Sequence, residues 1–146
     1  MLNEALKECI KWLKSADLTE AEISDRLAKK GYDSTVIASV VEQLKNRTWI
    51  NDQRVAERQA ELAKQKLVGR LKVEQTLEKR QVAEDKRDSV LEDFDDASEA
   101  QRAHNLLDQR LKEGDGIAKA ARILGSRGFT EEVIRSVLES RYPDDF

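Results

Sequence analysis

The residue types that perform most enzyme chemistry are scarce in this sequence. It contains one cysteine, Cys9, and one histidine, His104, and both fall within helical patterns. A catalytic nucleophile and its base must be held against each other, and a third group usually orients the base. Cys9 lies on an apolar stripe, where small buried cysteines commonly occur. We therefore interpret both as ordinary helix residues and predict that the protein is not an enzyme.

Metal and phosphate sites are also not indicated. The acidic cluster within residues 93–99 lacks the spacing and central glycine of an EF-hand loop, which favours a solvated turn. The glycines of Gly114–Gly116 do not follow a strand, so they do not form a phosphate-binding loop. We expect no metal and no cofactor.

Basic residues are concentrated in the middle of the chain. Residues 51–81 carry eight basic and five acidic side chains, whereas residues 82–100 carry two basic and eight acidic side chains. The whole chain has a net charge of −3. The eight basic residues are Arg54, Arg58, Lys64, Lys66, Arg70, Lys72, Lys79 and Arg80. Such cations can follow a phosphate backbone, but the same pattern arises on a solvated helix face. A basic segment beside an acidic one suits a partner that carries both signs of charge.

A similar unit occurs three times. Leu27, Leu77 and Leu124 each open a short segment that precedes an amphipathic stretch, and steps of 50 and 47 residues separate them. A nearly fixed period of this length is typical of repeat architectures. Basic residues fall at matching places, Lys29-Lys30, Lys79-Arg80 and Arg127, and stacking of the units is expected to bring them into one row.

Helical spacing and capping signals divide each unit into three helices. The Thr19 to Glu22 spacing predicts a capping box, and Gly31 is expected to end the second helix in a left-handed conformation. Ser98 with Gln101 repeats the capping-box spacing. The Trp49-Ile50 pair is interpreted as an anchor that closes one unit onto the next, and the alternative role for Trp49 is to stack on a base.

We predict an all-α fold of three tandem three-helix repeats in an elongated curved rod. The expected units are residues 1–48, residues 49–94 with the basic centre, and residues 95–146 with a short C-terminal tail. Each unit is smaller than domains that usually fold alone, so stacking is expected to extend a shared core. The single cysteine excludes an intramolecular disulfide, and no segment reads as a membrane span or a secretory signal. We expect a cytoplasmic monomer.

Several segments, in their order and spacing, resemble the RecX family of recombinase regulators. These are residues 5–13, 23–32, 36–44, 49–56, 69–77 and 124–138. Val55 and Gln81 depart from the phenylalanine and glycine usual in that family. Lys86-Arg87 replaces an apolar pair, so we expect the start of that helix to be exposed, shifted in register or docked elsewhere.

The resemblance implies binding in the groove of the RecA filament on single-stranded DNA. There the protein would inhibit the recombinase, ATPase and co-protease activities of RecA, and so restrain homologous recombination and the SOS response. Our hypothesis is that the eight basic residues of segment 51–81 form the contact surface. Two alternatives remain: a helical module that binds DNA independently of RecA, and a scaffold that binds only other proteins.

Overall fold

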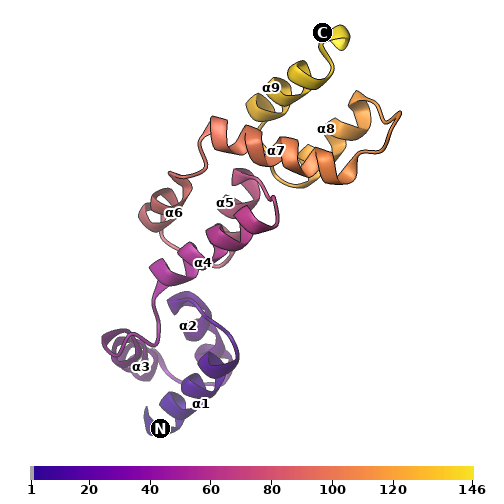
Figure 1. Ribbon diagram of the computed structural model, residues 1–146. Helices are drawn as coiled ribbons and strands as arrows, with labels where there is room; N and C mark the ends of the chain where they lie inside the picture. The colour runs from indigo at the N-terminus through magenta and orange to yellow at the C-terminus, as the bar shows by residue number, and fades with distance from the viewer. Residues whose placement is uncertain (1) are drawn as a thin grey trace.

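The protein is all-α, as predicted. The computed structural model describes residues 2–146, and over this range it contains nine α-helices, a short 3-10 helix and no strand. The helices are α1 (Leu2–Ser15), α2 (Glu20–Lys29), α3 (Ser34–Asn46), α4 (Asp52–Gln65), α5 (Arg70–Lys79), α6 (Glu84–Leu91), α7 (Asp96–Arg110), α8 (Ile117–Ser126), α9 (Glu131–Arg141) and η1 (Pro143–Asp145). They follow one another along an elongated body with the two termini at opposite ends (Figure 1). None of the helices within residues 2–146 has the length and apolarity needed to span a bilayer.

Most helix ends follow the signals in the sequence. The Thr19 capping box is present in full, and Gly31 has a φ of +93° directly after α2. The predicted capping box at Ser98 is wrong. Asp95 is the N-cap of α7, and its carboxylate accepts a hydrogen bond from Ser98 N at 2.8 Å. An aspartate is as good an N-cap as a serine, and here it stands three residues nearer the preceding helix.

The residue four positions after each leading leucine takes a left-handed conformation. Gly31, Gln81 and Gly128 have φ values of +93°, +60° and +86°. Glycine adopts this conformation at little cost, whereas glutamine has a Cβ that approaches the following carbonyl oxygen. The repeated backbone geometry therefore persists in the middle unit although the residue type does not.

The expectation of one shared core is wrong. Nearly all buried apolar residues within residues 2–146 fall into three separate clusters, one in each triplet of helices: α1–α3, α4–α6 and α7–α9. The half-buried Leu67, after α4, packs against the third cluster. The helix pairs that pack most extensively also belong to the same triplet. The leading leucines, Leu27, Leu77 and Leu124, are fully buried, one in each cluster. The triplets must therefore be connected by something other than a continuous apolar core.

Arg87, the second residue of the charged pair in α6, is docked on its own triplet. Arg87 donates a hydrogen bond from its guanidinium to Val82 O at 3.0 Å and lies 3.9 Å from the carboxylate of Glu78. Its side chain is 20% exposed, so the aliphatic part is covered while the charge is paired. Because the apolar positions at the start of α6 are lost, only Val90 and Leu91 of this helix are buried.

Candidate functional site

The cysteine and the histidine are not brought together. Cys9 lies in α1 and His104 in α7, which belong to the first and third triplets. Burial, and secondarily the charge of Glu8, raises the pKa of Cys9 to about 11, which disfavours the nucleophilic thiolate. His104 Nδ1 instead lies 2.9 Å from the guanidinium of Arg141. In the part of the chain that the structure describes, no three His, Cys, Asp or Glu side chains are grouped to hold a metal ion.

The first joint, between triplets α1–α3 and α4–α6, is centred on Arg80. Its guanidinium donates to both carboxylate oxygens of Glu22, at 2.9 and 3.1 Å, and to Asp17 O at 2.7 Å. In return, Thr19 Oγ1 donates to Arg80 O at 2.9 Å. Burial raises the pKa of Glu22, but hydrogen bonds from Arg80 and Thr19 outweigh burial and set that pKa below its usual value. Arg80 is thus a structural residue of the joint.

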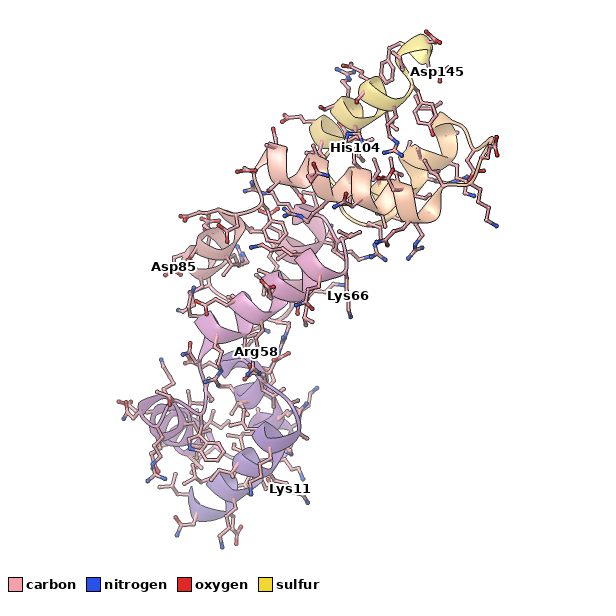
Figure 2. All side chains as sticks on the ribbon, in the orientation of Figure 1. Lys11, Arg58, Lys66, Asp85, His104 and Asp145 are labelled. Carbon is pink, nitrogen blue, oxygen red and sulfur yellow. The ribbon has the colours of Figure 1, made fainter. Side chains whose placement is uncertain are left out.

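Two further predicted site residues lie in the first joint. Arg54 and Arg58, one turn apart on α4, both contact the carboxylate of Asp17, at 3.3 and 3.1 Å. Arg54 also donates to the carbonyl oxygens of Thr48 and Trp49. Figure 2 shows Arg58 where α4 meets the first triplet. These cations therefore hold the joint and the loop before α4, and Arg58 remains largely exposed.

The second joint, between triplets α4–α6 and α7–α9, is a close contact of backbones. Gly69 N donates to Arg127 O at 2.7 Å, and Leu71 N donates to Gly128 O at 3.0 Å. A Cβ at Gly69 would lie 2.5 Å from the carbonyl carbon of Gly128 and 2.6 Å from Phe129 N. Only glycine permits this approach, because a methyl group would overlap backbone atoms that cannot rotate away.

Side chains reinforce the second joint from both directions. Lys72 Nζ donates to Ser126 O at 3.1 Å, at the C-terminal end of α8, where a cation is stabilised by the exposed carbonyl groups. The Arg127 guanidinium donates to Lys66 O at the end of α4. Lys72, a predicted site residue, is therefore also engaged in a joint through its ammonium group.

Each joint uses one carboxylate in the same way, and that of Glu99 is buried whereas that of Asp52 is half-buried. Asp52 accepts a hydrogen bond from Glu20 N at 2.9 Å, and Glu99 accepts one from Arg70 N at 2.6 Å. Both carboxylates thus bind the exposed N–H groups at the start of the second helix of the preceding triplet. Burial is the largest influence on both groups and raises the pKa of Asp52 and of Glu99. Arg102, 3.3 Å from Glu99, provides the second charge of that site.

Our reading of the sequence missed these two acids, although a signal was present. Asp52 and Glu99 are 47 residues apart, which is the step from Leu77 to Leu124. Both stand near the start of the first helix of a unit. A search for recurring acids at the repeat period, beside the recurring leucines, would have found them.

The joints place the second helices of the triplets end to end. The C-terminal end of α8 meets the N-terminal end of α5, and the C-terminal end of α5 meets the N-terminal end of α2. Helix dipoles aligned head to tail attract each other. The basic residues at these ends do not form an open row, because Arg80 and Arg127 both turn into the joints.

The other four predicted site residues lie on the middle triplet. Lys64 Nζ lies 3.1 Å from Asp93 and 5.6 Å from the centre of the Phe94 ring. Within residues 2–146, the side chains of Lys66, Arg70 and Lys79 make no ion pair or hydrogen bond; Lys66 and Lys79 are exposed and Arg70 is half-buried. Figure 2 shows Lys66 at the end of α4, beside the third triplet. Lys66 and Lys79 are available to a partner without breaking a contact, whereas the charge of Arg70 also acts on Glu99.

Only one residue of the Trp49-Ile50 pair is buried as an anchor would be. Ile50 is buried in the core of the first triplet, whereas Trp49 is 38% exposed. Trp49 is one of the residues that line a surface pocket at the first joint. The interpretation of Trp49 as an anchor is therefore wrong.

Comparison with known proteins places the chain among regulatory proteins. A family model described as "RecX, first three-helix domain" matches residues 5–44. A protein named Regulatory protein RecX from Deinococcus radiodurans is 32% identical over 136 residues, which cover 88% of this chain and 65% of that protein. One of the same name from Clostridium tetani is 28% identical over 139 residues, 90% of this chain and 64% of that protein. The chain thus spans slightly less than two thirds of these relatives.

Solved structures share the fold over nearly the whole chain. The crystal structure of RecX from Lactobacillus salivarius superposes with a TM-score of 0.80 at 16% identity and covers 95% of each chain. A second crystal structure, of a regulatory protein RecX, gives a TM-score of 0.76 at 19% identity and covers 94% of this chain and 71% of the other. The solved structures show the shared fold, and the matched first domain and the curated relatives support assignment of the chain to the RecX family of regulatory proteins.

Proposed function

We propose that the protein binds in the groove of the RecA filament on single-stranded DNA and inhibits RecA. It would restrain the recombinase, ATPase and co-protease activities, and thereby homologous recombination and the SOS response. It would act as a monomer, through its three units of residues 1–48, 49–94 and 95–146, without enzyme activity of its own. Membership of the RecX family supports a regulatory role, and the resemblance in sequence suggests RecA as the partner.

One observation carries the proposal. Lys66 and Lys79 are exposed on the middle triplet, their side chains make no ion pair or hydrogen bond among residues 2–146, and the half-buried Arg70 beside them acts on Glu99 without a direct ion pair. The acidic segment 82–100 follows, from the end of the middle triplet into the start of α7. A filament groove presents both DNA phosphates and protein side chains, so a partner surface with both signs of charge is complementary to it.

The shape of the body also favours this partner. The triplets extend along one direction (Figure 1), and polar joints hold each to the next. An elongated body can contact several successive subunits of a filament, and each additional contact raises the overall affinity.

We assign different roles to the eight basic residues. Lys66, Arg70 and Lys79 would make the primary contacts. Lys64 and Lys72, whose ammonium groups contact single oxygen atoms, would contribute beside them. Arg54, Arg58 and Arg80 would act mainly by keeping the first two triplets in place.

Co-sedimentation tests the proposal. We expect the protein to pellet with RecA filaments on single-stranded DNA far better than with naked duplex DNA, and to slow ATP hydrolysis by RecA. Equal binding to both would favour the RecA-independent DNA module. If removal of the central basic residues leaves binding to filaments unchanged, a scaffold that contacts protein alone is favoured.

A charge variant makes the test specific. The combined change Lys66→Gln, Arg70→Gln and Lys79→Gln removes three charges without breaking a joint. If all three contact phosphates, the slope of log affinity against log salt should fall by about 2, because each phosphate on single-stranded DNA contributes about 0.7. The matched control, Lys7→Gln, Lys11→Gln and Arg135→Gln, removes three exposed charges from α1 and α9. If both variants lose the same affinity, the effect is one of net charge and the proposed surface is wrong.

A further inference from the structure

A basic pocket lies at the first joint, beside the loop that connects α3 to α4. It has a volume of about 570 Å³ and is bordered by the end of α1, residues 47–49 and the first half of α4. Four cations line it, Lys14, Arg47, Arg54 and Arg58, against a single carboxylate, that of Asp17. The net charge of the lining is therefore +3, although the whole chain has a net charge of −3.

The cations of the pocket differ in how they are held. Arg54 and Arg58 both contact Asp17, which satisfies part of their charge. Lys14 and Arg47 are exposed and make no ion pair within residues 2–146. Since one carboxylate cannot neutralise four cations, the pocket retains a charge that an anion would balance.

An aromatic residue lines the pocket beside these cations. Trp49 is one of few exposed large apolar residues, and it is part of the pocket lining. Tryptophan is the best platform for stacking against a planar group or a cation. A solvent-facing indole beside several cations is the combination by which proteins bind the base and the phosphate of a nucleotide together.

The loop is held in a conformation that has an energetic cost. Thr48, which precedes the indole, has a φ of +58°, and this region is a genuine outlier for a β-branched residue. Arg54 donates hydrogen bonds to Thr48 O at 3.1 Å and to Trp49 O at 3.3 Å, and Asp17 fixes Arg54 in turn. Strained residues persist only where the surroundings hold them, and they are frequent at ligand sites. The backbone that carries the ring is thus held in place before any ligand arrives.

We infer that this pocket binds one nucleotide unit, with its base stacked on Trp49 and its phosphate held by Arg47, Lys14 and Arg58. The ligand class is a nucleobase attached to a phosphate, either as a free nucleotide or within a single strand. The inference goes beyond the proposed function, because it assigns a ligand to a site that needs no RecA. It also gives Arg58 a role besides the joint.

Fluorescence of Trp49 tests the inference directly. In a Trp12→Phe background, Trp49 is the only tryptophan. We expect a short oligothymidylate to quench its emission as the base stacks on the ring. Thymidine monophosphate is the second probe. If only the oligonucleotide quenches, the site takes a nucleotide within a strand; if both quench, it also takes free nucleotides. If neither quenches, the inference is overturned.

Variants separate stacking from charge. With a labelled oligonucleotide, Trp49→Ala should weaken binding roughly tenfold, since a stacked base contributes that much. Arg47→Gln should lower the salt slope by about 0.7, whereas Arg110→Gln, an exposed cation on α7, should leave binding unchanged. Circular dichroism of each variant confirms that the helices remain. Equal loss with Arg47→Gln and Arg110→Gln would overturn the assignment.

The two proposals can fail independently. If the pocket does not bind a nucleotide, the Trp49→Ala variant should still co-sediment with RecA filaments. If the protein does not bind RecA filaments, the oligonucleotide should still quench the emission of Trp49.

Discussion

Substitution of Gly69 by alanine is expected to break the second joint. The new Cβ would lie 2.5 Å from the carbonyl carbon of Gly128 and 2.6 Å from Phe129 N. Ordinary contacts between such atoms are about 3.5 Å, so α5 and α8 must separate by about 1 Å. All of the overlapping atoms belong to the backbone, so no side-chain rotation relieves the overlap.

The free-energy cost follows from the hydrogen bonds that this separation breaks. The distance from Gly69 N to Arg127 O would increase from 2.7 Å to about 3.7 Å, beyond the range of an N–H···O bond. The bond from Leu71 N to Gly128 O, now 3.0 Å, would be lost in the same way. Two bonds at about 1 kcal/mol each give a destabilisation of about 2 kcal/mol.

Urea unfolding followed by circular dichroism measures this change. The matched control is Gly125→Ala on α8, where an added Cβ meets nothing within 4 Å. Because glycine inside a helix costs about 0.5–1 kcal/mol relative to alanine, the control should be stabilised. The two glycine-to-alanine changes are thus expected to have opposite signs. If Gly69→Ala unfolds at the same urea concentration as Gly125→Ala or as the unchanged protein, the contact at the joint does not contribute as described.

Substitutions at three further positions follow from the joints and the repeated geometry. Gln81→Gly should stabilise the protein by about 1 kcal/mol, since it removes a Cβ from a φ of +60°; a lower urea midpoint would contradict this. Glu99→Ala should cost about 1–3 kcal/mol because Arg70 N loses its acceptor, whereas Glu99→Gln keeps an acceptor oxygen and should be at least as stable as wild type at pH 7. The expected stability of Glu99→Gln follows from the raised pKa of Glu99, because burial favours the uncharged carboxyl. As the pH rises through that pKa, Glu99 becomes charged and the protein loses stability. Glu22 has a pKa below its ordinary value of 4.5, so its pairing with Arg80 stabilises the protein when the pH is above 4.5. This stability is lost as the pH falls through the lowered pKa. Thermal unfolding across this pH range should show that loss in wild type and not in Glu22→Gln.

The sequence alone determined the class of fold and the repeated unit. Helical spacing, the capping box at Thr19 and the glycine after the second helix are local features, and short-range hydrogen bonds decide them. Leu27, Leu77 and Leu124 share one place in the repeat, and all three are fully buried. The family resemblance depends on the same local patterns, and comparison with known proteins confirms it.

Only the tertiary structure decided which charges are available. Arg80 and Lys79 are neighbours of similar type, yet Arg80 is paired with Glu22 across a joint and Lys79 faces solvent. The difference depends on residues 58 positions apart, and a pattern read along the chain does not specify a partner at that separation. The same holds for Gly69, whose need for a small residue comes from the backbone of Gly128. Local periodicity fixes helices, whereas the contacts between helix ends exist only once the triplets have folded and met.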